Sequence, residues 1–195
     1  MSAVIIGLCG GMGVGKSTAF ESVQFLYGKN AVLVKFAQPL YDMQEFIYRR
    51  ISSVYQRPEG FKKDRKLLQL LGTEWGRDMI SPSIWIDLWK NELVRIRESG
   101  KIAVCDDVRF PNEILALKEL CGYLVMVKSD KVLARVGDQL GIGGHTSEKP
   151  LDENAMDAII TNNGTKKEFH EKILNLLKDL SSITRQKQSA DSAKE

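Results

Sequence analysis

The chain has 195 residues, of which 43% are hydrophobic and 27% charged, and its formal net charge is +3. This length predicts a single domain with a sizeable core, and the ordinary composition excludes a disordered, fibrous or disulfide-stapled protein. The charge is too small to indicate nucleic acid as a partner. No apolar run approaches the roughly 20 residues of a membrane span, and no secretion signal opens the chain. We therefore expect a cytoplasmic protein that binds neither membrane nor nucleic acid, with Cys9, Cys105 and Cys121 reduced in its core.

Runs rich in Val, Ile and Leu alternate along the chain with longer segments of helical period. Such alternation predicts an α/β fold, a three-layer sandwich in which helices cover a five-stranded parallel sheet. The predicted strands are residues 3–9, 31–36, 101–106, 122–128 and 158–161.

Local signals mark the ends of the predicted helices. The first helix follows Lys16 and ends at Gly28, and the last begins with a capping box formed by Thr165 and Glu168. The other helix starts are indicated, in chain order, by Pro39, Ser83 and Pro111. After Thr184 the sequence is polar and has no periodicity, so residues 185–195 are predicted to form a disordered tail.

Two segments exceed what a minimal five-stranded sheet requires. One is a helical insert at about residues 38–100, and the other is a glycine-rich loop at about residues 137–150. Both follow the carboxyl ends of predicted strands, where open parallel sheets bind ligands. We expect a single domain over residues 1–184 whose functional site lies at this edge.

Residues 10–18 read Gly-Gly-Met-Gly-Val-Gly-Lys-Ser-Thr and match the phosphate-binding P-loop pattern between a strand and a helix. The glycines allow consecutive backbone N–H groups to point at phosphate oxygens, and the following helix adds its positive dipole end. Lys16 is expected to reach the β- and γ-phosphates and Ser17 to ligate Mg²⁺. The candidate nucleotide-binding residues here are Gly11, Gly13, Val14, Gly15, Lys16, Ser17 and Thr18.

Other nucleotide-binding classes fit the sequence less well. A dinucleotide fingerprint fails because Lys16 or Thr18 stands where its third glycine should be. The Asn-Lys-x-Asp element of guanine-specific GTPases is missing, and the chain is small for a ring motor. A small kinase needs basic groups for a second phosphate and a means of excluding water, and the two extra segments could supply both.

Charged residues gather at the end of the third predicted strand. Asp106 could hold Mg²⁺ through water, and Asp107 could accept a proton from the acceptor, although either could instead cap the helix that begins at Pro111. Arg109 could grip an acceptor phosphate with both arms of its guanidinium.

The insert contributes further candidates. Arg65 and Gln69 share one helix face, which is ordinarily just solvated, and Arg77 could simply pair with Glu74. Among the aromatic residues, Trp85 and Trp89 have the spacing of core residues, whereas Phe36 is a candidate for stacking on a base.

Five further motifs accompany the P-loop, in the order residues 36–40, 71–77, 107–113, 145–148 and 162–165. Together they resemble bacteriophage-type deoxynucleoside monophosphate kinases, within the P-loop nucleoside monophosphate kinase-like group. The resemblance covers about residues 5–180. The P-loop is common to many families, whereas the Leu-Gly-Thr-Glu and Asp-Val-Arg-Phe-Pro-Asn-Glu motifs are much more specific to this one. It implies transfer of the γ-phosphoryl of ATP, with Mg²⁺, to a deoxynucleoside monophosphate.

The resemblance also implies roles for individual residues. Asp107 would lie near the reacting phosphate, and Asn162 and Gly164 would flank the adenine. A mobile lid over residues 137–150 would have Arg135 at its base. The acceptor site would include Ala37, Arg65, Gln69, Thr73, Arg77 and Arg109, and Phe36 and Glu148 are further candidates for binding the substrate.

Three points stay open at this level. Relatives of adenylate kinase usually carry several arginines in the lid, whereas here Arg135 and Lys149 only bracket it, so the cation that stabilises the transferring phosphoryl is undetermined. Kinases of phosphomevalonate or dephospho-coenzyme A, and a nucleotide-dependent switch, are the alternatives. The sequence does not decide whether the chain forms a homodimer.

Overall fold

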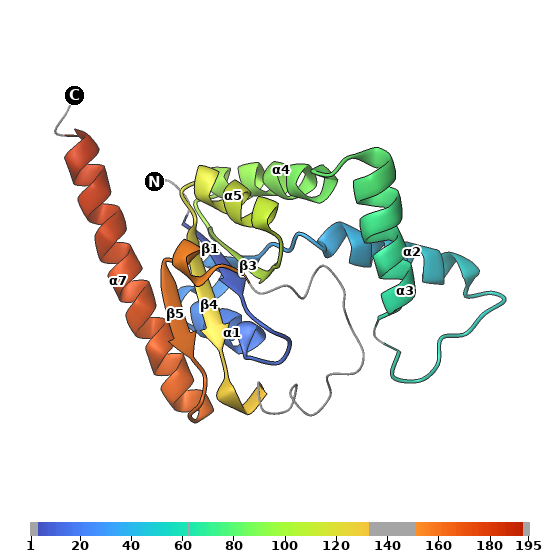
Figure 1. The fold of residues 1–195 in the computed structure, drawn as a ribbon, viewed down its shortest axis with the longest axis horizontal. Helices are drawn as coiled ribbons and strands as arrows, with labels where there is room; N and C mark the ends of the chain where they lie inside the picture. The colour runs from blue at the N-terminus through green and yellow to red at the C-terminus, as the bar shows by residue number, and fades with distance from the viewer. Residues whose placement is uncertain (1–3, 62, 133–150, 193–195) are drawn as a thin grey trace.

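Five parallel strands form the centre of the computed structural model, which describes residues 4–61, 63–132 and 151–192. The strands are β1 (Ile5–Cys9), β2 (Ala31–Leu33), β3 (Ile102–Val108), β4 (Tyr123–Lys128) and β5 (Ala158–Thr161). Their order in the sheet is β2-β3-β1-β4-β5, so β1 lies at the centre with β3 and β4 beside it. The predicted α/β fold with a five-stranded parallel sheet is confirmed (Figure 1).

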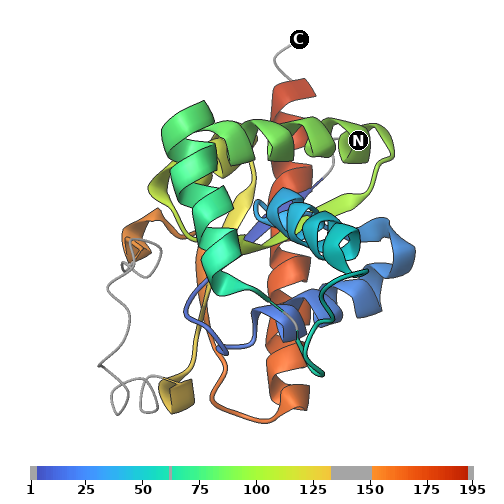
Figure 2. The same cartoon turned by 90° about the vertical axis from the view of Figure 1, so that its right-hand side faces the viewer.

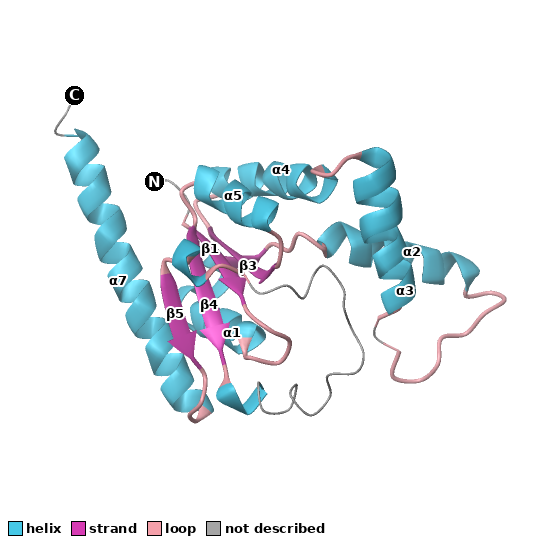
Figure 3. Ribbon diagram, viewed as in Figure 1, coloured by secondary structure: helices cyan, strands magenta, loops and turns pink. Residues whose placement is uncertain are grey.

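Helices surround this sheet (Figure 3). The main helices are α1 (Lys16–Tyr27), α2 (Gln38–Ile51), α3 (Arg65–Gln69), α4 (Ile84–Glu98), α5 (Pro111–Glu119) and α7 (Lys166–Ser192). Shorter elements are the 3₁₀ turns η1 (Gly28–Asn30) and η4 (Glu153–Ala155) and the π-helix η2 (Leu70–Ile80). Within the described residues, no helix combines the length and the apolar character needed to cross a bilayer.

The two faces of the sheet carry separate cores, because successive residues of a strand point to opposite sides. Ile5 of β1 packs in one core with Trp89 of α4 and Leu117 of α5. Its neighbour Ile6 packs in the other core, with residues of α1 and with Phe169 of α7. The pair α4 and α5 therefore covers one face, and the pair α1 and α7 covers the other.

The insert between β2 and α4 extends away from the sheet on the side opposite α7 (Figures 1 and 2). It consists of α2, α3 and η2, and it contains no strand among its described residues, as predicted. Asp64 fastens α3 to α2: its backbone N–H donates to Gln44 Oε1 (2.7 Å), and its carboxylate accepts from the Tyr48 hydroxyl (2.7 Å). The same carboxylate caps α3 through the Leu67 N–H (3.0 Å).

Some boundaries differ from the predicted ones. β3 continues to Val108, which pairs with Cys9 after a shift in register between the two strands, so Asp107 lies inside a strand rather than after it. β2 ends at Leu33, because the chain then turns into α2. α7 continues to Ser192, past the tail expected from residue 185, and the continuation contains neither glycine nor proline.

The three cysteines are free, as predicted, but they do not all lie in the core. Cys9 and Cys105 are buried, whereas Cys121 is exposed in the turn after α5, where its φ of 55° is in the left-handed region.

Candidate active site

The loop between β1 and α1 has the backbone of a phosphate cradle. Gly10, Gly13 and Gly15 have φ values of 129°, 81° and 112°, which side-chain-bearing residues rarely adopt. A Cβ atom at Gly10 would also collide with the Val127 carbonyl oxygen. The helix α1 begins directly at Lys16, so its N-terminal N–H groups and its dipole face the loop.

Lys16 folds back across this loop. Its ammonium donates to the carbonyl oxygens of Gly10 and Gly11, both at 2.7 Å. Burial is the main cause that lowers the pKa of Lys16, and the positive charge of Arg109 lowers it further. Asp106 also acts on the pKa, in the opposite direction. The ammonium therefore shares its electrostatic environment with charged residues at the end of β3.

Asp106 and Ser17 are the candidate ligands for Mg²⁺. Asp106 is buried, and Lys35 Nζ lies 3.0 Å from its Oδ1, which accepts no well-aligned hydrogen bond within the described part of the chain. Ser17 is exposed in the first turn of α1. Carboxylate and hydroxyl oxygens are the donors that Mg²⁺ prefers, and a buried carboxylate oxygen without a hydrogen bond fits such a ligand.

Asp107 uses its carboxylate to hold the backbone that enters α2. Its Oδ1 accepts from the Phe36 N–H (3.0 Å) and its Oδ2 from the Ala37 N–H (2.9 Å). The Cys105 thiol also lies 3.2 Å from Oδ1. Burial raises the pKa of Asp107, while these donors lower it. Both oxygens are thus engaged in fixing the junction of β2 and α2.

Phe36 itself does not fit the stacking role expected from the sequence. Its ring is 2% exposed and packs against Trp89, with 4.4 Å between the ring centroids. A base cannot reach a ring that is part of the core between the sheet and α4. The burial of Trp85 and Trp89, by contrast, confirms the prediction that both are core residues.

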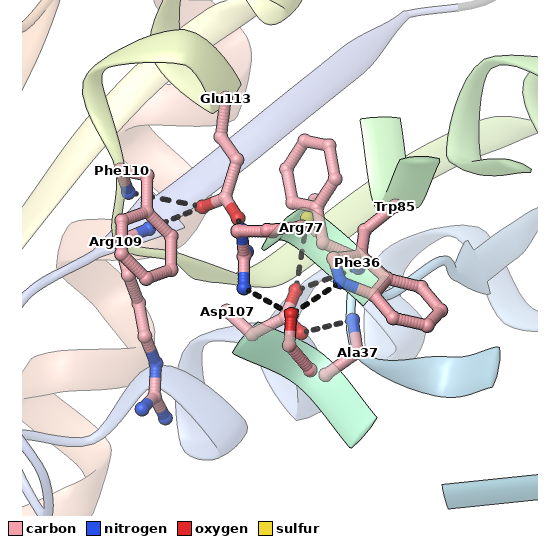
Figure 4. Close-up of polar contacts among 10 residues, drawn as sticks. Phe36, Ala37, Arg77, Trp85, Asp107, Arg109, Phe110 and Glu113 are labelled. Atoms are coloured by element: carbon pink, nitrogen blue, oxygen red, sulfur yellow. Dashed lines mark hydrogen bonds and ion pairs between the residues drawn. The ribbon is translucent and has the colours of Figure 1, made fainter. Parts of the chain in front are cut away.

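A second polar cluster joins the insert to the start of α5 (Figure 4). The buried carboxylate of Glu113 accepts the backbone N–H groups of Arg109 (2.7 Å) and Phe110 (3.0 Å). Arg77 of η2 contacts the same carboxylate, with 3.5 Å between Nη2 and Oε1. The predicted alternative, a local pair between Arg77 and Glu74, is not what the structure contains, because η2 directs the guanidinium toward α5.

Phe110 contacts Arg77 and is the neighbour of Arg109 in the sequence. The Arg77 guanidinium stacks on the Phe110 ring, 4.3 Å from its centroid, and donates to the Gly72 carbonyl (3.0 Å). Arg109 is exposed, and its side chain extends away from Glu113 (Figure 4). Its charge acts instead on Lys16 of the phosphate loop.

The other predicted residues of the insert lie on its surface. Arg65 and Gln69 are the first and last residues of α3 and are exposed, and Thr73 is half-buried in η2. Gln69 lines a shallow hollow of about 390 Å³ together with neighbouring residues of α3 and η2. Among the described residues, no hydrogen bond or ion pair joins Arg65 or Gln69 to the cluster around Glu113.

Asn162 and Gly164 follow β5 at the same edge of the sheet. The Asn162 amide donates to the Val14 carbonyl (2.9 Å), and a Cβ at Gly15 would collide with that amide. Asn162 therefore lies against the P-loop. Arg135, Glu148 and the lid predicted at residues 137–150 fall outside the described residues.

Glu113 is the residue that sequence reasoning missed. It stands in the Asp-Val-Arg-Phe-Pro-Asn-Glu motif, and its position three residues after Phe110 is the position at which a glutamate caps a helix. That signal could have placed its backbone contacts in advance. Its contact with Arg77 joins residues 36 positions apart in the sequence, and no local sequence pattern predicts it.

A parallel sheet of this order, with a P-loop after its central strand and a helical insert after β2, is the architecture of a P-loop nucleotide-binding protein. The fold of APS kinase from Mycobacterium tuberculosis is similar, with a TM-score of 0.53 and 12% identity over 91% of this chain and 98% of that one. The family described as deoxynucleotide monophosphate kinase matches residues 18–173. The chain belongs to this deoxynucleotide monophosphate kinase family and is a phosphotransferase.

Individual relatives agree with this assignment. A protein of Acanthamoeba polyphaga mimivirus, named as a deoxynucleotide monophosphate kinase, is 30% identical over 205 residues, covering 92% of this chain and 99% of the relative. The deoxynucleoside-5'-monophosphate kinase of Escherichia phage T5 is 41% identical over 59 residues, which is 30% of this chain and 23% of that protein.

Proposed function

We propose that this kinase transfers the γ-phosphoryl of ATP to a deoxynucleoside monophosphate, giving the diphosphate and ADP. The observation that carries the proposal is the phosphate cradle of the P-loop, with the Lys16 ammonium lying across it. The positive charge of Arg109 lowers the pKa of Lys16, and a bound phosphate would relieve the repulsion between these two like charges. An enzyme that joins two phosphorylated substrates needs such positive charges.

On the donor side, the N–H groups of the P-loop and Lys16 would hold the β- and γ-phosphates. Ser17 and Asp106 would hold Mg²⁺, which supplies charge neutralisation on the phosphates when it is bound. Asn162, which lies against Val14, and the adjacent Gly164 would border the adenine side of this pocket.

On the acceptor side, Arg77 and Arg109 would bind the monophosphate with their planar guanidinium groups. Ala37 and Thr73, with Arg65 and Gln69 on α3, would line the remainder of the acceptor site along the insert. In this division the insert formed by α2, α3 and η2 would serve the acceptor, and the segment at residues 137–150 would close over both substrates.

The proposed reaction is a direct transfer between the two substrates, and the protein positions them and neutralises charge without forming a covalent bond. An oxygen of the acceptor phosphate attacks the γ-phosphorus in line, the bond from the γ-phosphorus to the bridging oxygen breaks, and ADP leaves with that electron pair. Because a phosphate monoester is largely a dianion near neutral pH, the attacking oxygen carries no proton that must be removed. Asp107 is therefore not needed as a base, in keeping with its engagement by Phe36 and Ala37.

An acceptor screen tests the proposal. ADP formation should depend strictly on a deoxynucleoside monophosphate, whereas phosphomevalonate or dephospho-coenzyme A should not replace it. Strict dependence on either of those compounds, or steady ATP hydrolysis without any acceptor, would assign the protein to another function.

Arginine variants then locate the acceptor phosphate. Arg77→Lys and Arg109→Lys keep the charge but lose the two-armed geometry, so each should lower kcat/KM for the acceptor by about 10-fold or more, with little change in the KM for ATP. Arg95→Lys is the matched control, because Arg95 is 80% exposed and pairs only locally with Glu92. Loss of ATP affinity with unchanged acceptor affinity would place both arginines on the donor side.

A further inference from the structure

Glu113 connects three parts of the fold through one buried carboxylate. It lies in the first turn of α5 and its side chain is 3% exposed. One oxygen, Oε2, receives the backbone N–H groups of Arg109 and Phe110, at 2.7 and 3.0 Å. The other, Oε1, faces the Arg77 guanidinium of the insert at 3.5 Å. The end of β3, the start of α5 and the insert thus meet at this side chain.

The guanidinium of Arg77 is held on three sides at this junction. The Gly72 carbonyl accepts from Nη1, the Phe110 ring lies beneath the guanidinium carbon, and Glu113 faces Nη2. A guanidinium has five N–H donors; one is hydrogen-bonded to Gly72, and the contact with Glu113 is an ion pair at 3.5 Å. These contacts fix the plane of the group, whose side chain is 23% exposed.

Capping α5 does not by itself require a carboxylate. A glutamine at this position can accept backbone N–H groups with its amide oxygen, and glutamine and glutamate are both found in this capping role. A buried carboxylate is costly by comparison, and burial raises the pKa of Glu113 to about 7 despite its two N–H donors. What the carboxylate adds to an amide is a negative charge, which strengthens the two N–H contacts and attracts the Arg77 guanidinium.

We propose that Glu113 is a positioning residue for phosphoryl transfer, and that it acts by holding the Arg77 guanidinium and the Arg109 backbone at a fixed separation. The inference rests on the proposed function, because it assumes that the two arginines share the acceptor phosphate. Glu113 itself would not touch the substrate, since its oxygens are engaged by protein groups.

The variant that separates positioning from capping is Glu113→Gln. It keeps the length of the side chain and an oxygen for the α5 cap, and it removes only the charge that faces Arg77. We expect kcat/KM for the acceptor to fall by about 10-fold or more, while the KM for ATP changes less than about twofold and the protein remains folded. Glu119→Gln is the matched control, since Glu119 is on the same helix and pairs with Lys90 at the surface.

A double variant tests the route through Arg77. In an Arg77→Lys background, Glu113→Gln should add less than about a twofold further loss, because the group that it positions is already altered. Multiplication of the two single effects would show that Glu113 acts independently of Arg77 and would overturn the proposal.

The proposal also fails if folded Glu113→Gln uses the acceptor within about twofold of the wild type. Should this variant not fold, the same criterion applies to Glu113→Asp, whose shorter carboxylate keeps the charge but cannot span all three partners. If neither variant folds, the role is structural and the proposal is wrong. All measurements use the best acceptor from the wild-type screen, so an unexpected acceptor would refute the proposed function without deciding the role of Glu113.

Discussion

The stability of this protein should depend on pH through Glu113. Burial raises the pKa of this carboxyl from 4.5 to about 7 in the folded chain. The charged groups that face it are Asp107, which raises the pKa, and Arg77, which lowers it. Because the folded protein binds the Glu113 proton more tightly than the unfolded chain does, protonation stabilises the fold. This stabilisation is complete below pH 4.5 and is lost as the pH rises through about 7.

The size of the effect follows from the two pKa values. A difference from 4.5 to about 7 corresponds to about 3 kcal/mol over the whole range, since each pKa unit is worth about 1.4 kcal/mol. Part of the titration lies below pH 5, so about 2–3 kcal/mol should be lost between about pH 5 and about pH 8. Glu113→Gln cannot ionise, and the free energy of unfolding of this variant should lack that loss.

The measurement is urea unfolding of the wild type and of Glu113→Gln at several pH values across this window. In the difference between their free energies of unfolding, the contributions of titratable groups that do not interact with Glu113 cancel. It should move in favour of the variant as the pH rises, by about 2–3 kcal/mol. The surface control Glu119→Gln should track the wild type. A wild-type-minus-variant difference that stays constant with pH, or that moves in the opposite direction, would refute the reasoning about burial.

Two further variants test single residues of the site. Lys16→Ala should lose at least about 100-fold in turnover, because it removes the cation that would contact the transferring phosphoryl, and it should remain folded because Lys16 lies next to a loop. The control variant Lys29→Ala, at an exposed residue, should be unaffected. Near-normal turnover of Lys16→Ala would contradict the donor site. Asp107→Ala deprives the Phe36 and Ala37 N–H groups of their acceptor and should lower the free energy of unfolding by about 2–4 kcal/mol. The surface variant Asp42→Ala should lower it by about 0.5 kcal/mol or less. Both free energies are measured by urea unfolding. An Asp107→Ala protein as stable as that control would show that the carboxylate does not hold the entry to α2.

Elements with strong local signals were predictable from the sequence. Pro111 is the first residue of α5, and Gly28 follows the last residue of α1, as expected. At the start of α7, Thr165 and Glu168 exchange hydrogen bonds as a capping box, with the Glu168 N–H 3.2 Å from Thr165 Oγ1. The backbone of the P-loop also follows from its own glycines. In each case the residues that determine the geometry are close neighbours in the sequence.

The candidate site was harder to predict, because its contacts join distant segments. Asp107 appeared to follow a strand, but the pairing of β3 with β1 extends that strand, and the carboxylate binds a backbone 70 residues away. Phe36 appeared to border a pocket, but Trp89 of a distant helix takes it into the core. Arg77 appeared to have Glu74 as a partner one turn away, but η2 is a π-helix and the guanidinium meets Glu113 instead. Residue types and approximate location could be inferred, whereas partners required the fold.

The energetics of Glu113 separate its role from that of an ordinary buried residue. Above about pH 7, burial disfavours the charged form of Glu113 in the fold relative to the unfolded chain, and a glutamine could still cap α5. The charge therefore works against stability, and among its described contacts the groups that favour it are the Arg109 and Phe110 N–H groups and the Arg77 guanidinium. A substitution that merely damages the fold lowers stability and activity together. Glu113→Gln should separate the two: as the pH rises through about 7, its stability should increase relative to the wild type while its kcat/KM for the acceptor stays lower, because the same charge that burial penalises holds the Arg77 guanidinium in place.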